Sequence, residues 1–283
     1  MKILNQYNLP ESLLRAISYD EHKGEGYSIT ELISPPRILQ LRKRHAEEIK
    51  VDASERIWLL LGNAVHYILA KGKIIDSLVE EKLEAVIDGV AIRGRPDFLH
   101  EETILDYKVS SVWNAIYAPE GRREYTEQLN LYRYLYREEY KFPVNHLQIC
   151  MILRDWQKSK VSQANYPPIP IKMIDVPIWD ISDTLKFLWE RISQHVEASK
   201  LLDDSLPFCT AEEIWEKPGR YAIIKYGAKR AIKVLNTREE ANNILKDMAK
   251  VYSIEERLGE RTRCKSYCEV ASFCNQWKDL WRK

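Results

Sequence analysis

Apolar residues recur along the chain with two periods, and these predict alternating helices and strands. Amphipathic helices are expected where apolar positions return every three to four residues, over 54–71, 122–140 and 180–201. Strands are expected over 78–87, Ala91–Leu99, Ile104–Ser110, 145–154 and 171–176. Helices before and after a run of strands indicate an α/β fold, with a central mixed sheet flanked by helices.

The C-terminal part has a different pattern and is expected to form an extension. Residues 220–235 predict two short strands joined at Tyr226-Gly227-Ala228, and residues 237–250 predict a helix. We therefore divide the chain into a core over 1–201 and an extension over 202–283.

Helix-start signals support several of these elements. Residues 11–50 favour helices, and Pro35-Pro36 interrupts this stretch and begins a new helix. Ser54 is the expected cap of the helix over 54–71. Thr237 and Glu240 have the spacing of a capping box.

Composition is that of an ordinary globular protein. The 283 residues are 45% apolar and 30% charged, and the net charge of +1 predicts no global affinity for polyanions. No apolar run has the length of a membrane span, and the N-terminus lacks the apolar core of a secretion signal. We expect a cytoplasmic protein that contacts nucleic acid only through local patches.

The stretch over 89–111 carries the most informative polar residues. If the two strands form a hairpin that is symmetric about Glu101-Glu102, Asp97 lies opposite Asp106, with side chains about 5 Å apart. Lys108 follows Asp106 by two residues and shares its face. Two neighbouring carboxylates repel unless a cation lies between them, and such oxygen ligands suit Mg²⁺ or Mn²⁺. The alternative is a surface Asp–Lys pair on an edge strand.

Two helices add candidate residues. His66 lies one turn after Gly62, which leaves room beside the imidazole for a metal or a nucleic-acid backbone. Gln128 and Tyr132 are also one turn apart, and could contact phosphate or stack on a base. Each of these could equally be an ordinary partly buried helix residue.

Taken together, these segments resemble the PD-(D/E)XK nuclease superfamily, in its RecB-like branch that includes CRISPR-associated exonucleases. The matching segments occur in order: G-N-A-V-H at 62–66, G-R-P-D at 94–97, D-Y-K at 106–108 and Q-L-N-L-Y at 128–132. The opening at 29–45 and the cysteine-bearing tail look like those of phage-encoded members. A phage-encoded protein would work in the host cytoplasm.

The resemblance implies a restriction-endonuclease-like core and a role for each residue. Asp97 and Asp106 would bind the catalytic metal with His66, and Lys108 would orient the attacking water. Gln128 and Tyr132 would position the DNA strand. Because two carboxylates raise the pKa of a neighbouring lysine, we expect Lys108 to be a charged positioning group rather than a free base.

A cluster of cysteines near the C-terminus predicts a second metal centre. Cys264, Cys268 and Cys274 lie within eleven residues, and Cys209 is the expected fourth ligand. Cys150 is expected in the core. A [4Fe-4S] cluster, a zinc site and free thiols all remain open.

Similar RecB-like nucleases hold an iron–sulfur cluster with one cysteine before the core and three after it. Here the expected N-terminal position reads Ser34-Pro35-Pro36-Arg37. The four cysteines would instead close a loop over 209–274.

The segment over 220–233 has five basic residues and no acidic one. It predicts either a nucleic-acid contact or a solvated hairpin, and its candidate contacts are Lys225, Lys229, Arg230 and Lys233.

The function that these patterns favour is a Mg²⁺- or Mn²⁺-dependent DNA exonuclease. It would act at DNA ends or on single strands, in phage replication, recombination or repair. The alternatives are an endonuclease with the same metal site and a catalytically silent DNA-binding accessory protein. A zinc-tailed RNA-binding module would leave the paired acidic strands unexplained.

Overall fold

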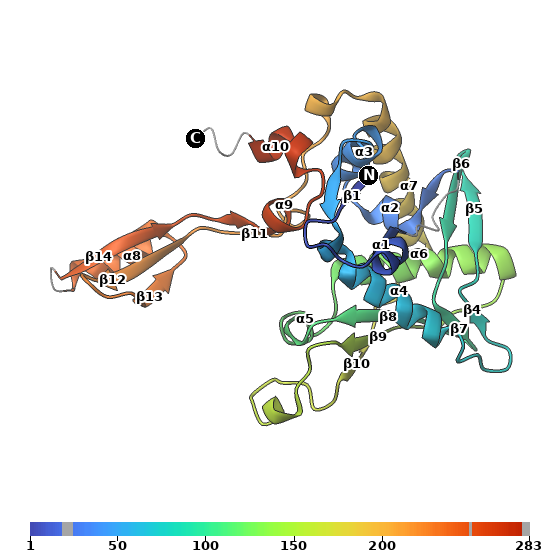
Figure 1. Cartoon of the computed structure of the whole chain (residues 1–283), viewed down its shortest axis with the longest axis horizontal. Helices are drawn as coiled ribbons and strands as arrows, with labels where there is room; N and C mark the ends of the chain where they lie inside the picture. The colour runs from blue at the N-terminus through green and yellow to red at the C-terminus, as the bar shows by residue number, and fades with distance from the viewer. Residues whose placement is uncertain (19–24, 249–250, 279–283) are drawn as a thin grey trace.

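The largest sheet among the described residues is a five-stranded mixed sheet, which we call the central sheet (Figure 1). The computed structural model describes residues 1–18, 25–248 and 251–278. In the sheet, β8 (Thr103–Ser110) and β9 (His146–Leu153) are parallel, and the other pairs are antiparallel. The remaining strands are β10 (Ile171–Asp175), β7 (Phe98–His100) and β4 (Leu78–Val79). The predicted α/β fold, with a mixed sheet flanked by helices, is confirmed.

Two strands predicted as continuous are each broken in the middle. The stretch 78–87 divides into β4 and β5 (Leu83–Ile87), and Ala91–Leu99 divides into β6 (Val90–Gly94) and β7. β5 and β6 pair in a second sheet with β2 (Tyr27–Ser28), whereas β4 and β7 belong to the central sheet.

The physical reason for the breaks lies in their residues. Glu80 has a positive φ of 54°, and Pro96 has no N–H group to donate to a ladder. At the break the Glu80 N–H donates to the Asp97 carbonyl at 3.1 Å. Because the two neighbouring strands break side by side, Glu80 and Asp97 lie next to each other.

The main core lies between the central sheet and two long helices. α6 (Arg123–Tyr140) packs against β5, β8 and β9, and α7 (Ile181–Lys200) packs against α6 and α2 (Ile29–Ile33). The face of α6 that lies against the core includes Leu131 and Leu135, which are both buried.

The helix expected over 54–71 forms, but its start and its exposure differ from the prediction. The Asp52 side chain, rather than Ser54, caps a short 3-10 turn (Ala53–Arg56), and α4 (Ile57–Leu69) follows without a side-chain cap. None of the residues of α4 is buried, although the helix packs against α1 (Glu11–Ser18) and β8.

Other helix signals are confirmed. α3 (Pro36–Arg44) begins at Pro36, and Thr237 forms a capping box with Glu240 at the start of α8 (Arg238–Lys246). Residues 19–24 of the expected helical stretch, 249–250 of the expected last helix and 279–283 of the extension lie outside the described residues.

The extension contains a small sheet that projects from the rest of the molecule (Figure 1). The predicted pair β12 (Arg220–Lys225) and β13 (Ala231–Leu235) forms, and an unpredicted strand, β14 (Tyr252–Arg257), pairs with β12. α8 packs against all three strands.

The cysteine-bearing part of the extension packs back onto the N-terminal region. Its elements are the pair β11 (Glu216–Lys217) and β15 (Glu260–Arg261), with α9 (Thr262–Ser266) and α10 (Asn275–Lys278). A second core cluster joins Val270 and Cys274 to Ile38 and Leu41 of α3. Nearby, β1 (Lys2–Leu4) pairs in parallel with β3 (Lys50–Asp52).

Within the described ranges, every helix is too short or too polar to cross a lipid bilayer.

Candidate active site and cysteine cluster

The hairpin formed by β7 and β8 has the predicted register. Phe98 pairs with Leu105 and His100 with Thr103, so Glu101-Glu102 forms the turn. Continued by one residue, this register places Asp97 opposite Asp106. Asp97 Oδ2 accepts a hydrogen bond from the Tyr107 N–H at 2.7 Å, which fixes the carboxylate beside β8.

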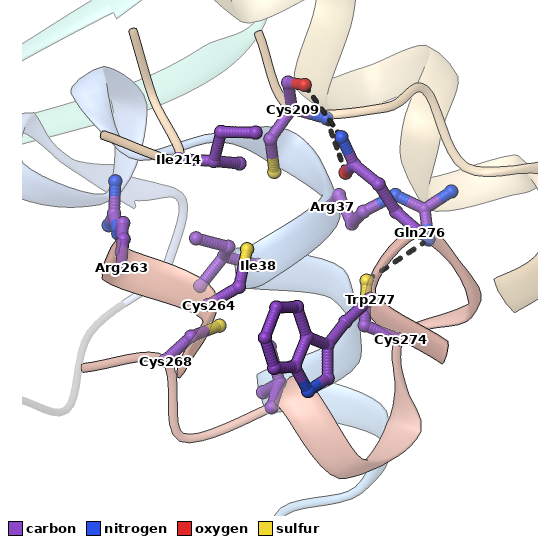
Figure 2. A pocket seen from close by; sticks show the side chains of 11 residues that line it. Arg37, Ile38, Cys209, Ile214, Arg263, Cys264, Cys268, Cys274, Gln276 and Trp277 are labelled. Carbon is purple, nitrogen blue, oxygen red and sulfur yellow. Dashed lines mark hydrogen bonds between the residues drawn. The ribbon is translucent and has the colours of Figure 1, made fainter. Parts of the chain in front are cut away.

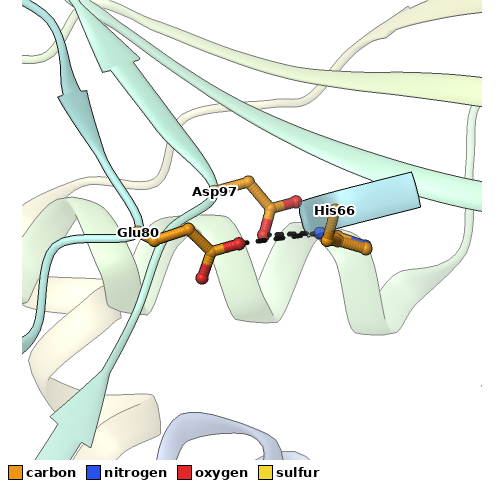
Figure 3. Close-up of side chains that lie close together, drawn as sticks. All are labelled: His66, Glu80 and Asp97. Atoms are coloured by element: carbon orange, nitrogen blue, oxygen red, sulfur yellow. Dashed lines mark ion pairs between the residues drawn. The ribbon is translucent and has the colours of Figure 1, made fainter. Parts of the chain in front are cut away.

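Three side chains from separate elements converge beside this hairpin (Figure 3). His66 Nδ1 on α4 lies 3.1 Å from Asp97 Oδ1 and 3.9 Å from Glu80 Oε1. One ligand atom from each of the three residues falls within 4.8 Å of the other two. An imidazole and two carboxylates at this spacing can hold a divalent cation.

Glu80 is a member of this group that the sequence reasoning missed. Its side chain also pairs with Arg95, whose Nε lies 2.8 Å from Glu80 Oε2. The signal in the sequence was the polar Glu80-Glu81-Lys82, which interrupts the apolar pattern of the strand expected over 78–87. This polar stretch indicated a break in the strand, but nothing in the sequence indicated that Glu80 lies beside His66 and Asp97.

Buried Asp106 and half-buried Lys108 form an ion pair next to the three converging residues. Asp106 is 2% exposed, and its Oδ2 lies 2.6 Å from Lys108 Nζ. Burial raises the pKa of Asp106 to about 6, although the Lys108 charge opposes this. Burial lowers the pKa of Lys108, but Asp106 and Asp97 outweigh it, and the pKa is raised, which is the direction expected for a charged ammonium.

Gln128 and Tyr132 support Lys108 from α6. Lys108 Nζ donates to Gln128 Oε1 at 3.1 Å, and Gln128 Nε2 donates to the Tyr132 hydroxyl at 2.9 Å. Tyr132 is only 6% exposed, so the expectation that it stacks on a base is wrong. Both residues lie on one helix face, as predicted; Gln128 contacts Lys108, and Tyr132 contacts Gln128.

The electrostatics of these residues suit a bound cation. The hydrogen bond to Asp97 raises the pKa of His66, against burial, which lowers it. Asp106 Oδ2 pairs with the Lys108 ammonium, and the Asp97 carboxylate acts on the same ammonium. Carboxylates fit Mg²⁺ or Mn²⁺, and the imidazole favours Mn²⁺.

The four cysteines outside the core line a single cavity (Figure 2). Cys209, Cys264, Cys268 and Cys274 come from the loop after α7, from α9 and from the turn before α10. Gln276 fixes the Cys209 backbone, because it accepts from its N–H at 2.9 Å and donates to its carbonyl at 2.8 Å. Burial raises the pKa of the Cys209 thiol to about 12, and the neighbouring Cys274 and Cys268 contribute.

Arg37 links this cavity to the N-terminal region. It is 1% exposed, and its Nη1 lies 3.6 Å from Cys274 Sγ and 2.6 Å from Asn275 Oδ1. The segment 34–37, where the resemblance placed an N-terminal cysteine, therefore adjoins the cavity and contributes a buried cation. Cys150 lies on β9, half-buried, away from this cavity.

The predicted basic contacts all lie at one end of the projecting sheet. Lys225 ends β12, Lys229 and Arg230 lie in the turn, and Lys233 is on β13. All four side chains are exposed, and none forms an ion pair within the described part of the chain.

No protein-family model and no curated protein matches this chain. Among solved structures, SSO0001 is 18% identical with a TM-score of 0.43, covering 65% of this chain and 82% of its own. An alkaline exonuclease from Laribacter hongkongensis is 12% identical with a TM-score of 0.37, covering 61% and 88%. A phage related exonuclease from Haemophilus somnus is 14% identical with a TM-score of 0.28, covering 64% and 76%. Likenesses this low carry no functional argument.

Proposed function

We propose that this protein is a divalent-metal-dependent deoxyribonuclease that acts as an exonuclease at DNA ends or on single strands. The observation that carries the proposal is the convergence of His66, Glu80 and Asp97 beside the buried Asp106–Lys108 pair. Imidazole, carboxylates and a charged lysine are the groups needed to bind a cation and a phosphodiester together.

Each residue has a role that follows from its contacts. His66, Glu80 and Asp97, whose ligand atoms converge, would hold Mg²⁺ or Mn²⁺, and Asp106 beside them is the further ligand that the resemblance implies. When bound, the ion lowers the pKa of water and screens the phosphate charge. Lys108, held by Asp106 and Gln128, orients the water and stabilises negative charge on the phosphate. Tyr132 keeps Gln128 in place.

Two alternatives use the same residues. The first alternative is an endonuclease, which would use the same metal site. Either nuclease activity would suit phage replication, recombination or repair. A catalytically silent DNA-binding protein would have no need for a half-buried lysine fixed by two partners, because surface lysines bind phosphate equally well.

A digestion assay tests the proposal directly. Linear and circular DNA, labelled at each end where ends exist, are incubated with Mn²⁺ or Mg²⁺. Linear-only digestion identifies an exonuclease, and the label gives its direction. Asp106→Ala and Lys108→Ala should abolish cleavage, whereas Asp175→Ala, an exposed carboxylate on β10, should retain it.

Folding is checked separately by circular dichroism. Digestion of circular DNA would contradict the exonuclease proposal and would support the endonuclease alternative. Full activity in a folded Asp106→Ala or Lys108→Ala variant would overturn the site itself.

We propose that the four cysteines outside the core hold a [4Fe-4S] cluster. A zinc ion with Zn–S bonds of about 2.3 Å draws its thiolates to about 3.8 Å from one another. No three of these sulfurs lie within 4.8 Å of one another, although all line one cavity. The wider spacing favours a cluster, and the Arg37 N–H beside Cys274 suits a thiolate.

A further inference from the structure

α4 carries an exposed aromatic residue on the same side as the metal-site histidine. Trp58, Gly62 and His66 are spaced four residues apart, so they follow one side of the helix. Trp58 is 57% exposed, and a side chain added at Gly62 would meet no atom within 4 Å. The rise of a helix places Trp58 about 12 Å from His66 along its axis.

A contact with Arg154 places Trp58 at the end of the catalytic strand. The Arg154 guanidinium lies 4.3 Å from the centre of the Trp58 ring. Arg154 directly follows β9, and its N–H donates to the carbonyl of Ser110 at 2.9 Å. Ser110 is the last residue of β8, the strand that carries Asp106 and Lys108.

A pair of neighbouring aromatic side chains, Trp113 and Tyr117, also lies at this end of β8. α5 (Val112–Tyr117) begins directly after this strand, and Asn114 Nδ2 donates to Ser110 Oγ at 2.8 Å. Trp113 and Tyr117 on α5 are 62% and 65% exposed. Their ring centres lie 3.7 Å apart, so they form one exposed aromatic platform.

Arginines without acidic partners accompany these rings. Arg122 donates to Asn114 Oδ1 at 2.7 Å and lies 5.6 Å from the centre of the Trp215 ring, and Arg263 lies at the same distance from that ring. In the described ranges, Arg154, Arg122 and Arg263 form no ion pair with a carboxylate. Their charge is therefore available to an anionic ligand.

We propose that this surface, which comprises Trp58, Trp113, Tyr117, Arg122 and Arg154, binds single-stranded DNA as it meets the metal site. Bases stack on Trp58 and on the Trp113–Tyr117 platform, and phosphates contact the two arginines. A duplex already stacks its bases on one another, whereas every unpaired base offers a face to an exposed ring. The inference rests on the proposed nuclease function and names its substrate form.

The test compares binding without cleavage. Affinity for a fluorescent oligo(dT) and for a blunt duplex of equal length is measured by anisotropy in the presence of a chelator. Trp58→Ala and Trp113→Ala should each weaken oligo(dT) binding about tenfold and leave duplex binding within about twofold, because duplex affinity is set mainly by phosphate contacts. Trp58→Phe should keep most of the affinity. Trp189→Ala, an exposed tryptophan on α7, is the matched control and should bind like the wild type.

The outcomes separate this inference from the nuclease proposal. Unchanged oligo(dT) binding by both alanine variants, or equal losses on the duplex, would overturn the binding surface even if the wild type cleaves DNA. Selective loss in both variants supports the surface, even if the wild type shows no metal-dependent cleavage and the nuclease proposal fails.

Discussion

At the residue scale, the candidate site depends on groups whose side chains are already fixed by protein contacts. Asp97 is held by the Tyr107 N–H, Glu80 by Arg95, and Lys108 by Asp106 and Gln128. Such preorganisation is what a metal and phosphate site requires, because less of its binding energy is spent on ordering side chains.

Glu80 provides the sharpest residue-scale prediction, because only the structure revealed it. Glu80→Gln removes a charge from the group that includes His66 and Asp97. We expect the Mn²⁺ concentration for half-maximal cleavage to rise about tenfold or more. Glu84→Gln, an exposed carboxylate on β5, is the control and should behave like the wild type. An unchanged metal dependence in Glu80→Gln would remove Glu80 from the site.

At the element scale, the position of α6 depends on a close approach to β6. A Cβ on Gly94 would lie 2.7 Å from Tyr132 Cε1 and 2.8 Å from Ile29 Cδ1. The glycine therefore allows Tyr132 to lie against the strand and support Gln128 and Lys108.

Gly94→Ala should consequently lower both stability and activity. We expect a loss of about 1–3 kcal/mol in the free energy of unfolding, measured by denaturant titration. Gly62→Ala is the matched control: it has open space around it and lies within a helix, where alanine should stabilise by about 0.5–1 kcal/mol. Equal effects at the two positions would contradict the packing argument.

His45 links three elements near the cysteine cavity and predicts a pH dependence. Its ring stacks on Phe273, Nε2 lies 2.7 Å from Asp203 Oδ2, and Nδ1 lies 2.7 Å from Glu48 Oε1. The hydrogen bonds to Asp203 and Glu48 raise the pKa of His45, against burial.

The sign follows from the raised pKa. Protonated His45 stabilises the folded protein through its bonds to Asp203 and Glu48. This contribution is fully present below the unfolded-state pKa of about 6.5, and it is lost as pH rises through the higher pKa of His45 in the folded state. His45→Gln should therefore melt at a lower temperature than the wild type at pH about 6, and the difference should shrink at pH about 9. A difference that grows with pH would contradict this assignment.

At the scale of the whole molecule, α3 and the C-terminal extension meet at the cysteine cavity. α3 near the N-terminus contributes Arg37, and the C-terminal extension contributes all four cysteines. A cluster bound there would tie the extension to the core over 1–201, because the cavity walls come from both.

Purification without oxygen tests this second centre. We expect broad absorbance near about 400 nm, lost in Cys209→Ser and Cys274→Ser. Cys150→Ser is the control and should keep the colour, since Cys150 lies on β9 outside the cavity. A colourless wild type that contains zinc would refute the cluster.

The basic end of the projecting sheet gives a prediction about salt. If Lys229 and Arg230 contact phosphates, replacing both by Gln should lower the slope of log affinity for single-stranded DNA against log salt by about 1.4. Lys186→Gln with Lys200→Gln, both exposed on α7, should leave the slope unchanged. An unchanged slope in the first pair would identify a solvated hairpin.

The sequence alone determined the local elements and the acidic hairpin. Alternating apolar residues and the short Glu101-Glu102 connection were enough to place Asp97 opposite Asp106 and Lys108 on the same face. Pro36 at the first helical position marked the start of α3, and the Thr237–Glu240 capping box marked the start of α8. These features depend on residues that are close together in the chain, and the spacing of those residues in the sequence therefore predicts them.

Only the tertiary structure decided which distant residues complete the site. Glu80 joins His66 and Asp97 because two strands break at the same level, and Arg37 meets Cys274 because α3 packs on the extension. Tyr132 is buried rather than free for DNA because β6 approaches it at Gly94. These contacts arise from packing between segments far apart in the chain, and periodicity along the chain carries no information about them.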